Sequence, residues 1–211
     1  MSIICPAILA NDEQEYKKQI EKVKPFAERI QIDLKDNDFA FGESVELDKI
    51  WIPDSIVTDI HIMYRNPQDY LKTLIKLKPN MVIVHEESNC DIPKFASDLR
   101  ENNIKTGVCI LQQTSVEKVA YILPHVQHLL IFSGDLGHYG GKADLGLTSK
   151  ISKAKQIHKY LEIGWDGGIN AQNATELAKA GVDVLDVGGA ILNSDNPQDA
   201  YVTIKANITG I

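Results

Sequence analysis

The sequence predicts an α/β fold, a (β/α)8 or TIM barrel that forms a single domain over residues 1–211. Short β-branched apolar runs alternate with longer amphipathic runs from end to end, and eight such strand–helix units fit the chain. No linker, low-complexity tract or charge block marks a second domain. An open doubly wound sheet would usually carry Gly-x-Gly-x-x-Gly after its first strand, and the segment PAILANDEQ (6–14) has no such motif.

The apolar runs are expected as strands because they are short and rich in Val and Ile. They cover residues 3–9, 29–34, 57–63, 81–87, 105–111, 128–133, 162–167 and 184–191. In the second strand, Ile30, Ile32 and Leu34 alternate with Gln31, Asp33 and Lys35. Successive side chains of a strand point to opposite faces, so this strand has one polar face, which we expect to point into the interior.

The amphipathic runs are expected as helices, and residue types that cap helices stand at their ends. The runs cover residues 12–26, 66–78, 92–103, 115–126, 148–161, 170–181 and 196–208. N-cap residues stand at Asn11 or Asp12, Asn66-Pro67, Ser115, Asn170 and Asn196-Pro197, and Gly181 stands where a C-cap belongs. The crossover around 44–51, between the second and third strands, carries the weakest helix signal.

Composition narrows the class of protein. Apolar content of 44% and charged content of 24% are ordinary for a globular domain. A formal net charge of -7 argues against nucleic acid or an anionic membrane as the main partner, but it permits a small anionic ligand. Three scattered cysteines, no signal peptide and no apolar run of about 20 residues predict a soluble cytoplasmic protein with reduced thiols.

Ionisable side chains stand at the carboxyl ends of several predicted strands, where such barrels form their active sites. They are Asp33, Lys35, His61, His85, Glu87 and Asp166. Taken singly, a strand-end histidine is more often a hydrogen-bonded core residue, and an aspartate before Gly-Gly is as often a turn former. In a barrel, however, all of them converge on one mouth. Two facing carboxylates there suit transfer of a proton from one face of a substrate to the other.

Paired glycines follow the last three predicted strands. The pairs are Gly140-Gly141, Gly167-Gly168 and Gly188-Gly189. Tight turns alone would explain them, but glycine also lets a ligand approach the backbone N–H groups, and barrels frequently bind phosphate in the loops after strands seven and eight. The pattern therefore favours a phosphorylated small molecule.

Several segments together resemble the ribulose-phosphate 3-epimerase family over nearly the whole chain. They are CPAILANDEQ, QIDLKDNDF, DIHIMYRNPQDYL, VIVHEES, HYGGK, WDGGIN and VGGAIL. The resemblance implies a metal-assisted 1,1-proton transfer at C3 of a ketose phosphate, by default D-ribulose 5-phosphate to D-xylulose 5-phosphate in the pentose phosphate pathway. It also implies a homo-oligomer, either a dimer or a hexamer, without an organic cofactor.

The resemblance assigns roles to individual residues. Asp33 and Asp166 match the two acid–base carboxylates, and Met63 matches a residue that lines the site. Asp33, His61 and Asp166 match three of four ligands of a divalent metal (Zn, Fe or Mn). The phosphate-binding stretches contain Gly140, Gly141, Gly167, Gly168, Gly188 and Gly189, and His61 stands beside the substrate.

The chain also departs from the family pattern, most sharply on the second strand. Gln31 stands where the family has the fourth, histidine, ligand, and Lys35 replaces a methionine on the same strand face as Asp33. A neutral amide is a poor zinc ligand, so we expect weak or absent zinc binding. The Lys35 ammonium is expected either to stabilise the enediolate in place of the metal, or to pair with Asp33 or Asp166 and silence the base. Ala7, Phe132 and Gly189 replace further family residues.

Two other readings of the sequence stay open. Asp33, Lys35 and Asp38 spell Asp-x-Lys-x-x-Asp, which resembles the motif of the orotidine and ketogulonate phosphate decarboxylases, where the lysine protonates a carbanion. The chain would then be a phosphosugar decarboxylase or lyase. A non-catalytic phosphosugar-binding relative is the second alternative.

Overall fold

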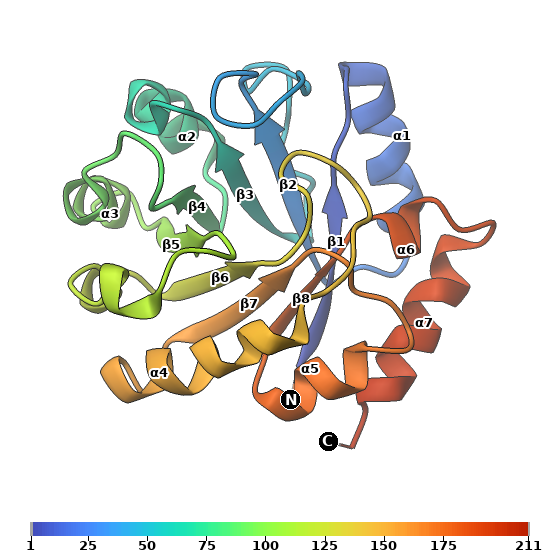
Figure 1. Ribbon diagram of the computed structural model, residues 1–211. Helices are drawn as coiled ribbons and strands as arrows, with labels where there is room; N and C mark the ends of the chain where they lie inside the picture. The colour runs from blue at the N-terminus through green and yellow to red at the C-terminus, as the bar shows by residue number, and fades with distance from the viewer. Residues whose placement is uncertain (1, 211) are drawn as a thin grey trace.

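The computed structural model describes residues 2–210, and it confirms the predicted barrel. Eight parallel strands close in chain order, β1 beside β2 through to β8 beside β1 (Figure 1). The strands are β1 Ile3–Ile8, β2 Arg29–Lys35, β3 Val57–Met63, β4 Met81–His85, β5 Lys105–Ile110, β6 His128–Phe132, β7 Glu162–Asp166 and β8 Val184–Val187. Each lies within a predicted run or differs from it by a residue or a few at its ends.

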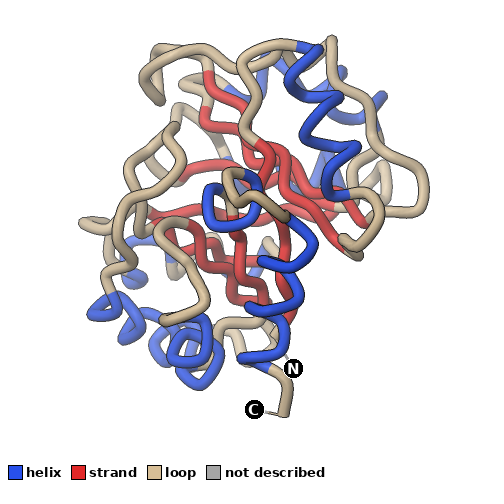
Figure 2. Tube along the Cα trace, turned by 90° about the vertical axis from the view of Figure 1, so that its right-hand side faces the viewer, coloured by secondary structure: helices blue, strands red, loops and turns tan. Residues whose placement is uncertain are grey.

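Helices surround the strands, as the tube view turned by 90° shows (Figure 2). They are α1 Glu13–Val23, α2 Leu71–Leu77, α3 Ile92–Arg100, α4 Ser149–Ile157, α5 Ala174–Ala180, α6 Gly189–Leu192 and α7 Pro197–Ile208. Short 3₁₀ helices cover Pro67–Tyr70, Val116–Val119, Leu123–His125 and Leu145–Thr148. Asp12 caps α1 by accepting from the Glu15 N–H at 2.8 Å, and Gly181 ends α5 at φ 101°.

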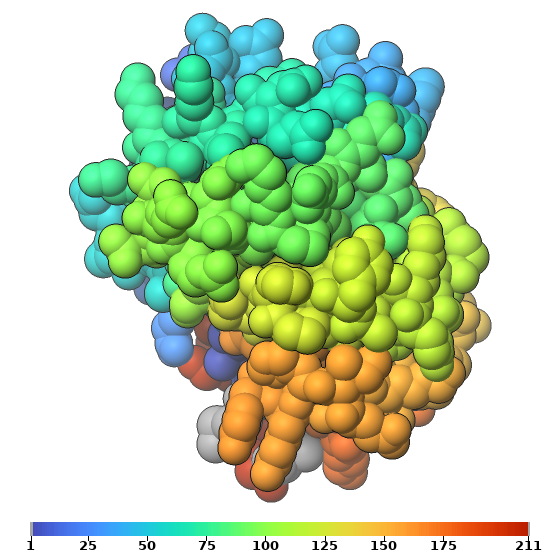
Figure 3. All heavy atoms as spheres, turned by 90° about the vertical axis from the view of Figure 1, so that its left-hand side faces the viewer, coloured from blue at the N-terminus to red at the C-terminus, as the bar shows by residue number. Residues whose placement is uncertain are grey.

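Two predicted helices are wrong, and each has a physical reason. The crossover 44–51 is irregular, because its buried residues Val45, Leu47 and Ile50 are not spaced as a helical stripe. The run 115–126 forms two 3₁₀ turns, because Pro124 lacks the N–H that a continuous α-helix needs. This run still covers the outer face of the barrel between α3 and α4 (Figure 3).

The main core lies between the strands and the helices. In β2, the apolar Ile30, Ile32 and Leu34 belong to this core, and the whole strand is buried. The alternate residues therefore point into the barrel, which places Gln31 and Asp33 in its interior. A second apolar cluster fills the interior with Met81, Ile83, Cys109, Leu130 and Phe132. Within residues 2–210, no helix combines the length and apolarity that a bilayer crossing demands.

Candidate active site

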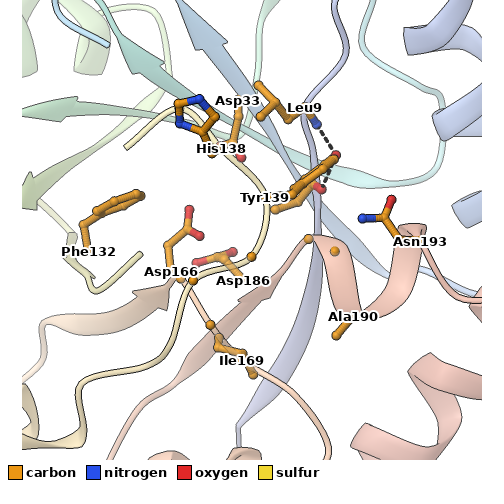
Figure 4. Close-up of a pocket in the computed structure, with 18 of the residues that line it drawn as sticks. Leu9, Asp33, Phe132, His138, Tyr139, Asp166, Ile169, Asp186, Ala190 and Asn193 are labelled. Atoms are coloured by element: carbon orange, nitrogen blue, oxygen red, sulfur yellow. Dashed lines mark hydrogen bonds between the residues drawn. The ribbon is translucent and has the colours of Figure 1, made fainter. Parts of the chain in front are cut away.

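A cavity of about 290 Å³ opens where the strands end at their carboxyl termini. Its walls come from strands far apart in the sequence, because barrel closure brings their ends to one mouth. Figure 4 shows Asp33, Asp166, Asp186 and Phe132 around it, and Met63 also lines it. The segments that contain the three glycine pairs form much of the remaining wall, together with the end of β1 and α6.

The two predicted acids do face the same cavity. Asp33 lies near the end of β2, and Asp166 is the last residue of β7. One carboxylate oxygen from each lies within 4.8 Å of the other and of the His61 ring. His61 Nδ1 is 3.1 Å from Asp33 Oδ1 and 3.7 Å from Asp166 Oδ2. This spacing allows both acids to flank a single carbon atom.

Gln31 bridges the two acids from below. Its side-chain N–H group donates to Asp33 Oδ1 at 2.9 Å and to Asp166 Oδ2 at 2.8 Å. Gln31 is 1% exposed, and its Oε1 atom has no hydrogen-bond partner. The amide therefore supplies a polar donor between two carboxylates, where a histidine would supply a lone pair to a metal.

Asp166 has the electrostatics of a proton donor. Burial is the main reason that its pKa is raised, the charge of Asp33 adds to the effect, and the pKa reaches about 7. The contacts with His61 and Gln31 act in the opposite direction but do not outweigh burial. At neutral pH this carboxyl group is thus poised to hold a proton or release it.

His85 and Glu87 hold the His61 ring in place through a series of side-chain contacts. His61 Nε2 lies 2.9 Å from His85 Nε2, and His85 Nδ1 lies 3.5 Å from the Glu87 carboxylate. Burial acts to raise the pKa of Glu87, but the contacts with His85, Thr114 and the Leu111 N–H lower it to about 2. A charged Glu87 favours a proton on His85 Nδ1, which leaves His85 Nε2 to accept from His61. His61 then turns the lone pair of Nδ1 toward the acid pair, as a metal ligand must.

Lys35 does not reach the acids. Its ammonium donates to the Gly137 carbonyl oxygen at 2.9 Å, in the loop after β6. No ion pair within 4.0 Å joins it to Asp33 or Asp166 in residues 2–210, so the predicted salt bridge is wrong. Lys35 shares the strand face of Asp33, but two residues of strand place it about 6–7 Å nearer the loops.

The glycine loops pack against one another. A Cβ atom at Gly167 would lie 2.0 Å from the Gly134 backbone nitrogen, and one at Gly168 would lie 2.2 Å from the Ala143 nitrogen. At Gly188 it would meet the Tyr139 ring at 2.6 Å. Close approach of the backbone therefore requires glycine at 167 and 168, and the Tyr139 ring occupies the space of a side chain at 188. All six predicted glycines line the cavity.

Asp186 is a site residue that the sequence reasoning missed. It lies on β8 in register with Asp166, it lines the cavity, and its Oδ2 atom has no hydrogen-bond partner. A positional signal was available, since Asp186 precedes Gly188 by two residues just as Asp166 precedes Gly168. Tyr139 was also missed. Its hydroxyl donates to the Ala7 carbonyl and accepts from the Leu9 N–H, which anchors the loop after β6 to β1.

Asp33, His61 and Asp166 are the residues that could hold a metal ion, since their ligand atoms converge and His61 Nδ1 faces the acids. The donors fit in part, because Gln31 presents N–H groups to the same two carboxylate oxygens. His61, His85 and Cys109 form a second convergent group. It is completely buried in the barrel interior, and burial raises the pKa of the Cys109 thiol.

Comparison with known proteins gives a consistent result. The model of the ribulose-phosphate 3 epimerase family matches residues 3–192. A ribulose-phosphate 3-epimerase from Helicobacter pylori is 28% identical over 201 residues, which is 90% of this chain and 91% of that protein. One from Mycobacterium tuberculosis is 27% identical and covers 96% of this chain and 91% of its own. One from Bacillus subtilis is 24% identical, and the match covers 97% of this chain and 98% of that protein.

Solved structures share the fold at low sequence identity. A 3-hexulose-6-phosphate synthase superposes with a TM-score of 0.77 at 15% identity, covering 98% of this chain and all of that one. A tryptophan synthase from Mycobacterium tuberculosis superposes with a TM-score of 0.74 at 11% identity, and the match covers 98% of this chain and 92% of that one. These neighbours support the barrel architecture and nothing finer.

Proposed function

The chain belongs to the ribulose-phosphate 3-epimerase family, and we propose that it inverts C3 of a ketose phosphate, with D-ribulose 5-phosphate as the substrate. The observation that carries the proposal is the pair Asp33 and Asp166, whose oxygens lie within 4.8 Å of each other in one cavity. Epimerisation needs a base on one face of the reacting carbon and an acid on the other.

The raised pKa of Asp166 makes it the acid, and Asp33 the base, when ribulose 5-phosphate is converted to xylulose 5-phosphate. Asp33 takes the proton from C3, which leaves an enediolate, and protonated Asp166 then delivers its proton to the opposite face. After turnover the proton is on Asp33, and the pair resets by exchange with solvent. The raised pKa of Asp166, which burial and the Asp33 charge cause, supplies the proton-holding acid that this direction requires.

Charge on the enediolate oxygens needs a partner, because an α-proton is too weak an acid to leave otherwise. Both N–H donors of Gln31 are taken by the two acids, so its amide holds the carboxyl groups in place rather than contacting the enediolate. A divalent cation held by Asp33, His61 and Asp166 would supply positive charge to the same oxygens. We propose that Gln31 weakens binding of Zn, Fe or Mn at this site relative to a fourth imidazole.

The glycine loops provide the phosphate end of the site. Gly140, Gly141, Gly167, Gly168, Gly188 and Gly189 line the cavity. Because glycine has no side chain, an anion bound there would be able to approach the backbone N–H groups. Among the residues lining this cavity there is no lysine or arginine.

The proposed partners are a ketose phosphate as the substrate and other copies of the chain, as in a dimer or hexamer. The cytoplasmic location stays a prediction.

The decarboxylase alternative receives less support from the geometry. Lys35 is directed at Gly137, and Asp38 is exposed, where it pairs with Arg65 at 3.7 Å. The three residues of the Asp-x-Lys-x-x-Asp motif are therefore not assembled around one substrate position. A non-catalytic phosphosugar-binding protein would keep the glycine loops but would have no use for the acid pair.

One experiment separates these functions. Purified protein is incubated in D2O with a panel of ketose phosphates, with and without added Mn²⁺ or Zn²⁺, and is followed by NMR. We expect deuterium at C3 of ribulose 5-phosphate, xylulose 5-phosphate as product and no CO2. Release of CO2 would instead support a decarboxylase. Thermal stabilisation by the ketose phosphate without exchange would support a binding protein.

A further inference from the structure

We propose that Asp186 is a specificity-determining residue, which hydrogen-bonds the substrate hydroxyl that lies between the reacting carbon and the phosphoryl group. The inference rests on the proposed function, because it takes the positions of the acids and the glycine loops as the two ends of a bound ketose phosphate. It adds a third carboxyl group, which the two-acid mechanism does not use.

Asp186 occupies on β8 the place that Asp166 occupies on β7. The two residues are register partners in the barrel, and each stands two residues before a glycine of the phosphate-side loops, Gly168 and Gly188. Both side chains therefore point into the barrel interior, side by side on neighbouring strands. Figure 4 shows the two carboxyl groups near each other at the cavity, between Phe132 and Ala190 of α6.

The Asp186 carboxyl group lacks the partners that a structural carboxylate would have. It is 3% exposed, and its Oδ2 atom is buried without a hydrogen bond. The neighbour in register on β1 is Cys5, and a thiol is only a weak donor. An unsatisfied buried acid destabilises the fold, so a ligand that satisfies it accounts for its presence better than packing does.

The missing partner is best supplied by a hydroxyl group. A carboxyl oxygen accepts a hydrogen bond in either protonation state, and a hydroxyl group has a hydrogen to donate to it. With C3 between Asp33 and Asp166 and the phosphoryl group at the glycine loops, the connecting carbon lies along the β7–β8 side of the cavity. In a 2-ketopentose 5-phosphate this carbon is C4, and its hydroxyl is the group to which Asp186 forms a hydrogen bond.

The test compares ribulose 5-phosphate with its 4-deoxy analogue in wild type, Asp186→Val and Asp186→Asn. Valine suits β8 because this strand already contains Val184 and Val187. In wild type we expect kcat/KM for C3 deuterium exchange to fall about 100-fold or more for the deoxy analogue. In Asp186→Val the two compounds should differ by less than about fivefold, and Asp186→Asn should restore part of the difference because its amide still forms hydrogen bonds.

A binding measurement makes the test independent of turnover. Calorimetric affinities for the two compounds should show the same loss of discrimination in Asp186→Val, with Asp186→Ala as a second variant if valine impairs folding. The exposed Asp195→Val, beyond α6, controls for loss of one negative charge. Equal discrimination in wild type and Asp186→Val would overturn the inference, as would wild-type affinities within about threefold. Absence of C3 exchange in wild type would overturn the proposed function instead, and the affinities would still decide the role of Asp186.

Discussion

The two ends of the barrel interior can be compared directly, because each contains carboxylates on inward-facing strand positions. At the amino-terminal end, Arg29 donates to Asp59 at 2.6 Å and to both oxygens of Glu162 at 2.9 Å, and His128 Nδ1 is 2.7 Å from Glu162. At the carboxyl-terminal end, Asp33, Asp166 and Asp186 face one cavity whose lining contains no lysine or arginine.

This difference accounts for the opposite pKa shifts of Glu162 and Asp166. Burial acts to raise the pKa of Glu162, but the contacts with His128 and Arg29 bring it well below its usual range. Burial raises the pKa of Asp166 to about 7, because no guanidinium or ammonium group opposes it. A cation beside a buried carboxylate fixes its charge and contributes to structure, while an acid without one retains a proton that chemistry can use.

The largest expected effect comes from removing an acid at the carboxyl-terminal end. Asp33→Asn and Asp166→Asn should each abolish epimerisation, with a loss on the order of 10³–10⁴-fold or more in kcat, because an amide cannot exchange the proton. Coupled assay of xylulose 5-phosphate formation measures the loss, and circular dichroism checks that the fold is retained. Substantial turnover by either variant would rule out the two-carboxylate mechanism.

At the amino-terminal end, Arg29→Met should destabilise the fold without changing the chemistry. It leaves Asp59 and Glu162 without their cation, and we expect the free energy of unfolding to fall by about 3–5 kcal/mol. Urea denaturation measures the loss, and kcat per folded molecule should change less than about twofold. The exposed pair of Lys205 and Glu28, 2.8 Å apart, is the control, since Lys205→Met should cost under about 1 kcal/mol. Equal losses of unfolding free energy in the two variants would show that the position of the Arg29 ion pairs inside the barrel adds nothing to their contribution to stability.

The pH dependence of stability should differ between wild type and Asp166→Asn. The folded pKa of Asp166 is about 7 and its unfolded value about 4, so the native state holds a proton that the unfolded chain has released between these pH values. This group therefore stabilises the fold fully below about pH 4, and its contribution declines up to about pH 7. Thermal unfolding from pH 4 to 8 should show a smaller decline in the variant, while Asp195→Asn behaves as wild type.

Gln31→His should convert the bridging donor into a fourth ligand. We expect affinity for Zn²⁺ to rise by about 10–100-fold, because imidazole nitrogen is a better zinc ligand than an amide. Calorimetry on chelator-treated protein measures the affinity directly, and Gln31→Leu, which removes the donor but adds no ligand, should not show the rise. A tightly held stoichiometric ion in the wild-type protein would contradict the weakening assigned to Gln31.

The smallest effect is expected at Lys35, whose ammonium contacts the loop after β6. Lys35→Met should raise KM for the ketose phosphate a few-fold, since one hydrogen bond to the Gly137 carbonyl is lost, with kcat within about threefold. Lys142→Met, on the same loop, is the matched control. A fall in kcat beyond about 100-fold would restore the interpretation in which Lys35 stabilises the enediolate.

Much of the architecture could be predicted from local sequence. Each strand run was identifiable because apolar β-branched residues recur with short spacing, and α1 and α7 could be located because Asp12 and Asn196 cap them. The run 115–126 was misjudged because its apolar spacing suits a helix while Pro124 interrupts the backbone hydrogen bonds. Asp33, His61 and Asp166 were identified because each stands near the carboxyl end of a strand and the chain resembles the family there.

The sequence by itself determined the order of strands, the polar face of β2 and the glycines of the loops, because these depend on residue types close together in the chain. Only the tertiary structure decided what each polar group contacts. It directed Lys35 to Gly137 rather than to Asp33, and it left the Oδ2 atom of Asp186 without a hydrogen-bond partner. Such contacts depend on which strands become neighbours when the barrel closes, and on how far along each strand a side chain lies, and local patterns record neither.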